Sequence, residues 1–292
     1  MTEAEFNLPE AISTLRRDLK KRLAPLSRAA KALDALASEG ALDKLDVLNE
    51  HVDALRDADL AALGFSEALS AVMNRLMLLH DRLTTRARSE VLSDLMRLGA
   101  GIEITQLTEH PLAVLISPMV AELDMPASRA RILYSREVVD EVDLDARLIL
   151  DAREKAMKHI RDLAADSPAF FDAMLRAYRM VLLVRGLESS ERVDIVDMLA
   201  PLAFLQVDIG NWRKFDPEKA PAYPRYLLAY QLQKLQRDGL LIKDGLRVEL
   251  GTATGGSTRN KQDVIFIPTS PTDGQYYLSI RFVSQQQDVG FQ

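Results

Sequence analysis

The chain has 292 residues, 48% of them hydrophobic and 27% charged, and it contains no cysteine. This composition predicts a folded protein of about two domains and excludes disulfides, zinc ribbons, iron–sulfur clusters and a thiol nucleophile. The net charge is −6, but residues 211–292 hold 11 basic and 8 acidic residues and carry a net charge of +3. The basic character therefore lies near the C-terminal end of an acidic chain.

The sequence predicts no membrane contact. It does not open with a basic segment followed by an apolar one, and its longest apolar runs are far shorter than the roughly 20 residues of a membrane span. We therefore expect a soluble, cytoplasmic protein.

Helical periodicity dominates the first 206 residues. Near the N-terminus, apolar residues recur at three- and four-residue spacing on one face of an expected helix: Ile12, Leu15, Leu19, Leu23 and Leu26. The same pattern predicts helices over residues 42–60 and 66–98. The run 16–22 is strongly basic. Because its apolar neighbours keep their register, it indicates a solvated helix face, with binding of an anionic partner as the alternative.

The middle of the chain follows the helical pattern with one ambiguous segment. Residues 102–116 are compatible with two short strands or with a helix on either side of Pro111. Over residues 128–163, apolar residues at three- and four-residue spacing predict one long helix, as in a bundle or a short coiled coil. Two shorter helices are expected over residues 167–186 and 190–206.

The pattern changes after residue 206. Residues 207–223 form a connector that contains prolines and charged residues. Residues 224–238 predict a helix, and three strand patterns follow it: LLIKDGLRVEL, DVIFIP and QYYLSIRFV. The predicted fold class is therefore mainly α. An elongated helical bundle or coiled-coil-like domain spans 1–206, and a small α+β module of one helix and a three-stranded antiparallel sheet spans 224–292.

Templates for metal binding and catalysis find no match in this sequence. The four histidines, His51, His80, His110 and His159, are scattered and form no metal-binding motif. The densest acidic group, residues 140–145, has the spacing of a solvated helix face, and a carboxylate metal site is the alternative. No nucleophile elbow or catalytic triad can be placed. We expect no metal, no cofactor and no catalytic residue, which makes an enzyme the less favoured interpretation.

The polar stretch GTATGGSTRNKQ, residues 251–262, joins two of the strand patterns. It fits the spacing of a P-loop, but serine stands in place of the lysine and a strand pattern follows in place of a helix, which argues against nucleotide binding. The order helix, strand, loop, strand is similar to a winged-helix module over about forty residues. It departs from that family because the preceding helical pattern ends near Gln206, too far upstream for a turn of ~3–4 residues. A solvent-exposed hairpin loop is the alternative interpretation.

If this module contacts a partner or a nucleic-acid backbone, cationic and polar side chains are the groups to do so. They lie on the helix at 224–238, on the strand after it and in the loop: Arg225, Lys234, Arg237, Lys243, Thr252, Thr254, Ser257, Thr258, Arg259, Asn260 and Lys261.

Three functions follow from these patterns. The leading hypothesis is a non-enzymatic subunit of a multi-protein assembly, which associates with other subunits or with itself through its long amphipathic helices. The second is a DNA- or RNA-binding protein that uses the helix at 226–238 and the loop at 251–262. The third is an enzyme with an unrecognised carboxylate-based site.

Overall fold

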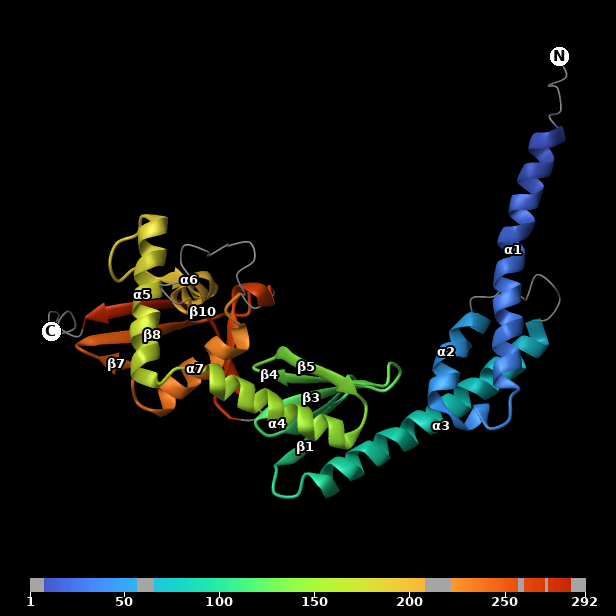
Figure 1. Ribbon diagram of the computed structural model, residues 1–292, viewed down its shortest axis with the longest axis horizontal. Helices are drawn as coiled ribbons and strands as arrows, with labels where there is room; N and C mark the ends of the chain where they lie inside the picture. Colours follow the sequence, from blue (N-terminus) through green and yellow to red (C-terminus); the bar gives the residue numbers. More distant parts are fainter. Residues whose placement is uncertain (1–7, 57–65, 208–221, 257–259, 271–272, 285–292) are drawn as a thin grey trace, which may run out of the picture. The chain divides into compact units, whose positions relative to one another are not determined.

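The computed structural model describes residues 8–56, 66–207, 222–256, 260–270 and 273–284 (Figure 1). The chain forms two units. The first comprises Met1–Arg97 together with the short segment Asp124–Arg129, and the second comprises Leu98–Leu123 together with Ala130–Gln292.

Three α-helices make up most of the first unit: α1 (Leu8–Leu36), α2 (Leu45–Arg56) and α3 (Ser66–Leu98). Helices were expected at these three places and are confirmed there, although residues 57–60 of the one expected over 42–60 lie outside the described residues. Between α1 and α2 the chain turns at Gly40, whose φ of 72° suits glycine because it has no Cβ to clash. The core of the unit combines small and branched apolar side chains: Ala29, Ala32, Leu36, Leu48, Val52, Leu55 and Leu76. The α1 residues of this core all follow Pro25, a proline inside the helix.

The second unit opens with a five-stranded sheet in which each strand neighbours the next one along the chain. Its strands are β1 (Ile104–Glu109), β2 (Leu112–Ile116), β3 (Met119–Asp124), β4 (Arg129–Tyr134) and β5 (Glu137–Asp143). The ambiguous segment 102–116 is thus a strand pair, and all five residues of β2 are buried. A strand buried on both faces carries a continuous apolar run and loses the alternation that would identify it in the sequence.

The predicted fold class is wrong. The protein is α+β with two antiparallel sheets, whereas the sequence patterns predicted a mainly α chain with strands confined to a small C-terminal module. The error lies in the helix expected over residues 128–163, since only its second half is helical. In the first half, β4 buries Ala130 and Ile132 and exposes Arg129 and Arg131, which is the period of a strand.

The turn between β4 and β5 explains why that hairpin was missed. Ser135 and Arg136 both have positive φ, 55° and 64°, as the two central residues of a type I′ turn do. Such turns favour Asn-Gly or Asp-Gly, and Ser-Arg gives no such signal. The acidic group expected on a helix face is also placed differently, because Asp140, Glu141 and Asp143 lie on β5 and Asp145 caps the next helix.

After the first sheet, the described residues form the α-helices α4 (Ala146–Leu163), α5 (Ser167–Arg185), α6 (Leu199–Leu205) and α7 (Arg225–Arg237). Local sequence sets their ends. The Asp145 carboxylate accepts hydrogen bonds from two backbone amides at the start of α4, and the Asp166 carboxylate accepts one from the Ala169 amide at the start of α5. Gly186 ends α5 in the left-handed conformation, as its position in the sequence predicted.

A second sheet closes the unit. Its strands are β6 (Val193–Asp194), β7 (Ile242–Lys243), β8 (Leu246–Thr252), β9 (Ile265–Pro268) and β10 (Gly274–Ser284). The order is β6-β10-β8-β7, with β9 also paired to β10 (Figure 1). Helix α5 packs on the face that carries Phe282, whose ring lies 5.5 Å from that of Phe171 and 5.1 Å from that of Tyr178. The opposite face carries the polar residues of β8 and β10.

Candidate functional site

The basic residues predicted to contact a partner are distributed over several surfaces, and Arg225 serves the fold. Its Nε donates to a Glu137 carboxylate oxygen at 2.7 Å, and its Nη1 donates to the Gln262 carbonyl at 2.8 Å. Its Nη2 donates to the carbonyls of Lys261 and Val264. The guanidinium of Arg225 therefore fastens the end of the polar loop to α7 and β5.

Helix α7 is enclosed by protein. The helix packs against β9, α5, α4 and β5. Six of its side chains are buried: Leu227, Leu228, Ala229, Gln231, Leu232 and Leu235. The Gln233 amide donates to the Pro268 carbonyl at 2.8 Å, and its oxygen accepts a hydrogen bond from the Tyr134 hydroxyl at 2.8 Å. A helix held from several sides is poorly placed to enter a DNA groove, because a recognition helix must present one open face to the bases.

The remaining predicted residues of α7 and β7 have individual settings. Lys243 donates to the Asp172 carboxylate, and its ammonium lies 5.9 Å from the centre of the Phe171 ring. The Lys234 ammonium lies 3.5 Å from the Ala165 carbonyl oxygen, and Arg237 is exposed. These cations do not converge with Arg225 on one patch.

The polar loop is described in part. Thr252 ends β8 and, like Thr254, is exposed. Asn260 caps a short helical turn by accepting a hydrogen bond from the Gln262 amide at 3.2 Å, and Lys261 is exposed. Ser257, Thr258 and Arg259 lie outside the described residues.

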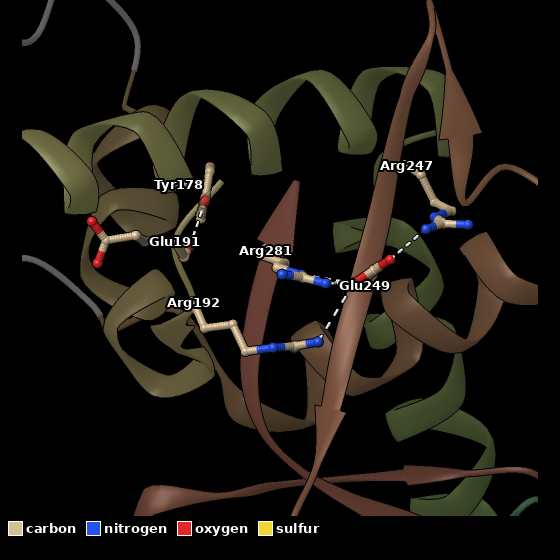
Figure 2. A network of polar contacts seen from close by, with 6 residues as sticks. All are labelled: Tyr178, Glu191, Arg192, Arg247, Glu249 and Arg281. Atoms are coloured by element: carbon tan, nitrogen blue, oxygen red, sulfur yellow. Dashed lines mark hydrogen bonds and ion pairs between the residues drawn. The ribbon is translucent and has the colours of Figure 1, made fainter. Parts of the chain in front are cut away.

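The densest charged group in the second sheet is one that the sequence patterns did not predict. Three arginines surround Glu249, and we call this group the arginine cluster (Figure 2). Arg281 donates to one carboxylate oxygen through Nε at 2.7 Å and Nη2 at 2.6 Å. Arg247 donates to the other oxygen at 2.6 Å. Arg192 lies 3.5 Å from the oxygen that Arg281 contacts.

Strand register brings these residues together. Glu249 on β8 stands directly opposite Arg281 on β10, so the two side chains share one face of the sheet. Arg247 lies two residues before Glu249 and therefore points to the same face. Arg192 immediately precedes β6, which pairs with the other side of β10, so its side chain must cross β10 to reach Glu249.

Gly251 makes room for that crossing. A Cβ atom at this position would lie 2.3 Å from the Ser279 Oγ and 2.9 Å from the Arg192 Nη1. Both distances are shorter than real contacts, so the guanidinium occupies space that a side chain on residue 251 would need. The first residue of the polar stretch thus shapes the arginine cluster and not a phosphate-binding loop.

The turn before Arg192 is held in place by the helix beneath it. The Tyr178 hydroxyl donates to the Glu191 carbonyl at 2.5 Å, and burial raises the pKa of that hydroxyl, so it stays protonated as a donor. The Glu191 carboxylate points away from the arginine cluster (Figure 2) and accepts a hydrogen bond from the Glu188 amide. Glu249 is therefore the acidic member of this group of contacts.

The arginine side chains are more exposed than the carboxylate that they share. Hydrogen bonding to Arg281 is the main reason that the pKa of Glu249 is lowered, so the carboxylate is ionised at neutral pH. This carboxylate is shared by three guanidinium groups. The arginine side chains are 36–42% exposed and the glutamate side chain is 21% exposed, so solvent meets mainly cations.

A second candidate surface lies in the first unit, on the part of α1 before Pro25. Four apolar side chains there are largely exposed, and we call them the α1 stripe: Ile12 at 56%, Leu15 at 62%, Leu19 at 51% and Leu23 at 59%. At 100° per residue, they lie within about 80° of one another around the helix. The sequence predicted this amphipathic face.

Metal binding and membrane insertion are two other properties that the described residues can be examined for. Among them, no group of three or more histidines and carboxylates is arranged to hold a metal ion. None of the helices that they form is long and apolar enough to cross a membrane.

Comparison with known proteins finds no relative of this chain. No protein-family model matches the chain, and no curated protein or solved structure is significantly similar to it.

Proposed function

We propose that this protein is a non-enzymatic subunit of a multi-protein assembly and that it joins its partner through the α1 stripe. The observation that carries the proposal is the exposure of all four stripe residues on one helix face. Burying a large aliphatic side chain contributes about 1.5–3 kcal/mol. A contiguous exposed apolar surface of this kind is typical of an interaction site.

The helix that bears the stripe gains little support from its own unit. The α1 residues in the core are Ala29, Ala32 and Leu36, all in the last third of the helix. Isolated helices of fewer than about 12–15 residues are marginal in water, and most helices in proteins are stabilised by packing. A partner that covers the stripe would supply that packing.

Charge identifies the chemistry of the partner. Residues 16–22 hold five basic residues and one acidic residue, and the run is centred on the middle of the stripe. A second copy of α1 laid along the stripe in either direction would bring the two basic runs together. An amphipathic helix with acidic residues beside its apolar face would meet opposite charges instead. We infer a partner of this acidic kind.

The test compares two variants of the full chain. In the first, the stripe variant, serine replaces Ile12, Leu15, Leu19 and Leu23. In the matched control, Leu183→Ser and Val184→Ser remove two even more exposed apolar residues, 83% and 85% exposed, from α5. Tagged proteins are purified from native cells, and Lys20 and Lys21 are joined to nearby carboxylates by a carbodiimide cross-linker. We expect the wild type and the control, but not the stripe variant, to retain a stoichiometric partner that is cross-linked through an acidic helix.

Two results would contradict the proposal. One is a homodimer of the purified chain, seen by light scattering, that the stripe variant abolishes, because it would make the occupant a second copy. The other is a partner that both variants retain equally after reconstitution from pure components.

A further inference from the structure

We propose that the arginine cluster on the outer face of the second sheet binds the phosphate backbone of a nucleic acid. This inference concerns the second unit and stands independently of the α1 stripe. It also places the nucleic-acid contact on Arg192, Arg247 and Arg281, and not on α7.

Donors remain on the cluster after Glu249 is satisfied. A guanidinium carries five N–H donors in a planar fork that matches the oxygens of a phosphate. The contacts to Glu249 use Nη2 of Arg192 and both Nε and Nη2 of Arg281. The remaining N–H groups of these two arginines can therefore donate to an anion while the carboxylate holds the side chains in place.

The neighbours of the cluster suit a phosphate. The Ser279 hydroxyl lies beside the Arg192 guanidinium above Gly251, and hydroxyl groups are common phosphate contacts. Arg247 and Arg281 also belong to residues 211–292, which carry a net charge of +3, whereas Arg192 lies in the acidic remainder of the chain.

The shape of the surface favours a polymer over a small free anion. The three arginines lie on β8, on β10 and directly before β6, and each side chain is more than a third exposed. An open face of this kind encloses no ligand, so a single phosphate would be held weakly. A nucleic-acid strand presents successive phosphates and gains from releasing several counterions at once.

The role of Glu249 distinguishes a binding surface from a structural ion network. If the cluster serves only the fold, Glu249→Gln weakens the network and does not improve the binding of any ligand. If the cluster binds phosphate, the same change removes the negative charge of Glu249 and weakens its hold on the donors of Arg192 and Arg281. Affinity should then rise although the network is weaker.

Fluorescence anisotropy tests this with the full chain and fluorescein-labelled DNA, as a duplex of about 20 base pairs and as a single strand of the same length, at about 50 and 200 mM KCl. We expect the double variant Arg192→Ala, Arg247→Ala to bind about tenfold more weakly at low salt. Its plot of log affinity against log salt should lose a slope of about 2 on the duplex, close to one for each lost contact. Glu249→Gln should bind severalfold more tightly.

The control is Arg131→Ala, which removes an arginine that is 50% exposed and paired with Glu122 at 2.8 Å on the first sheet. It should bind DNA like the wild type. Thermal unfolding of each variant checks that it is folded. If the alanine variants are unstable, Arg192→Lys and Arg247→Lys replace them, because lysine keeps the positive charge but lacks the planar set of donors of a guanidinium.

The proposal fails if the wild type does not bind either DNA at low salt, or if the cluster variants bind like the wild type. It also fails if Glu249→Gln binds more weakly than the wild type. Competition by polyglutamate at the same charge concentration as DNA would identify an acidic protein as the ligand, and stabilisation by inorganic phosphate without DNA binding would identify a small anion. Either outcome overturns the assignment to nucleic acid.

Discussion

Glu249 is the residue that holds the outer face of the second sheet together. Its two oxygens accept hydrogen bonds from arginines on two different strands, and a third arginine approaches from the turn before β6. Because the carboxylate is at the surface, each contact is screened by water and salt, and its contribution to stability is modest. The importance of Glu249 is geometric, since it aligns three long and otherwise mobile side chains.

The lowered pKa of Glu249 makes this contribution dependent on pH. In the unfolded chain its carboxyl titrates near the ordinary value of 4.5, and in the folded protein it titrates below that value. The stabilisation is therefore complete above the unfolded pKa and is lost as the pH falls through the folded pKa. We expect Glu249→Gln to lower the free energy of unfolding at pH 7 and to have a smaller effect at about pH 4, below the ordinary pKa of a glutamate. Urea unfolding at both pH values measures it, and an equal difference at the two pH values would contradict the assignment.

Elements differ in how much of their structure the sequence discloses. The helices α2 and α3 and the second half of the helix expected over residues 128–163 were predictable, because their buried residues recur with the helical period. The stretch LLIKDGLRVEL, expected to be one strand, is a hairpin of β7 and β8, because Asp244 and Gly245, both at positive φ, turn the chain in its middle. In the first sheet, β2 lacks alternation and the turn at Ser135 and Arg136 lacks a turn signature, so this sheet was missed.

The candidate site shows the same limit. The basic residues of the helix at 224–238 and of the polar loop were identifiable by type and position, but their partners were not. The sequence shows that Arg225 is basic, but only the structure shows that it donates to three backbone carbonyls and to Glu137. The arginine cluster joins residues 57 positions apart, Arg192 and Glu249. Sequence spacing does not predict such a contact without the strand register.

A comparison of two leucines, one on α2 and one on α1, can distinguish a residue that stabilises the fold from one that is available for binding. Leu48 of α2 is completely buried in the core, whereas Leu19 of α1 is 51% exposed. Leu48→Ala should cost about 2–5 kcal/mol because it removes buried methyl groups and leaves a cavity. Leu19→Ala should cost less than about 0.5 kcal/mol. Urea unfolding of the two variants checks this, and a large loss for Leu19→Ala would show that the stripe is part of the fold.

At the scale of the whole molecule, the division into two units predicts how the protein unfolds. Each unit has its own core, with Leu48 at the centre of the first and Phe171, which is 1% exposed, in the second. Separate cores lead to separate cooperative transitions, and a single two-state description then fails.

We expect two transitions in differential scanning calorimetry. Leu48→Ala should lower the midpoint of one of them and Phe171→Ala the midpoint of the other, each by several degrees. A single transition that both substitutions shift equally would show that the units unfold together.

Pro25 allows the two halves of α1 to open independently of each other. A proline has no amide hydrogen, so the Lys21 carbonyl lacks its usual donor one turn later, and the helix is held less tightly at that point. The residues before Pro25 can therefore open without disturbing those after it, and their amides should exchange with solvent much sooner. Occupation of the stripe would slow this exchange over residues 12–24 and leave residues 26–36 unchanged, so α1 itself would report on whether its partner is bound.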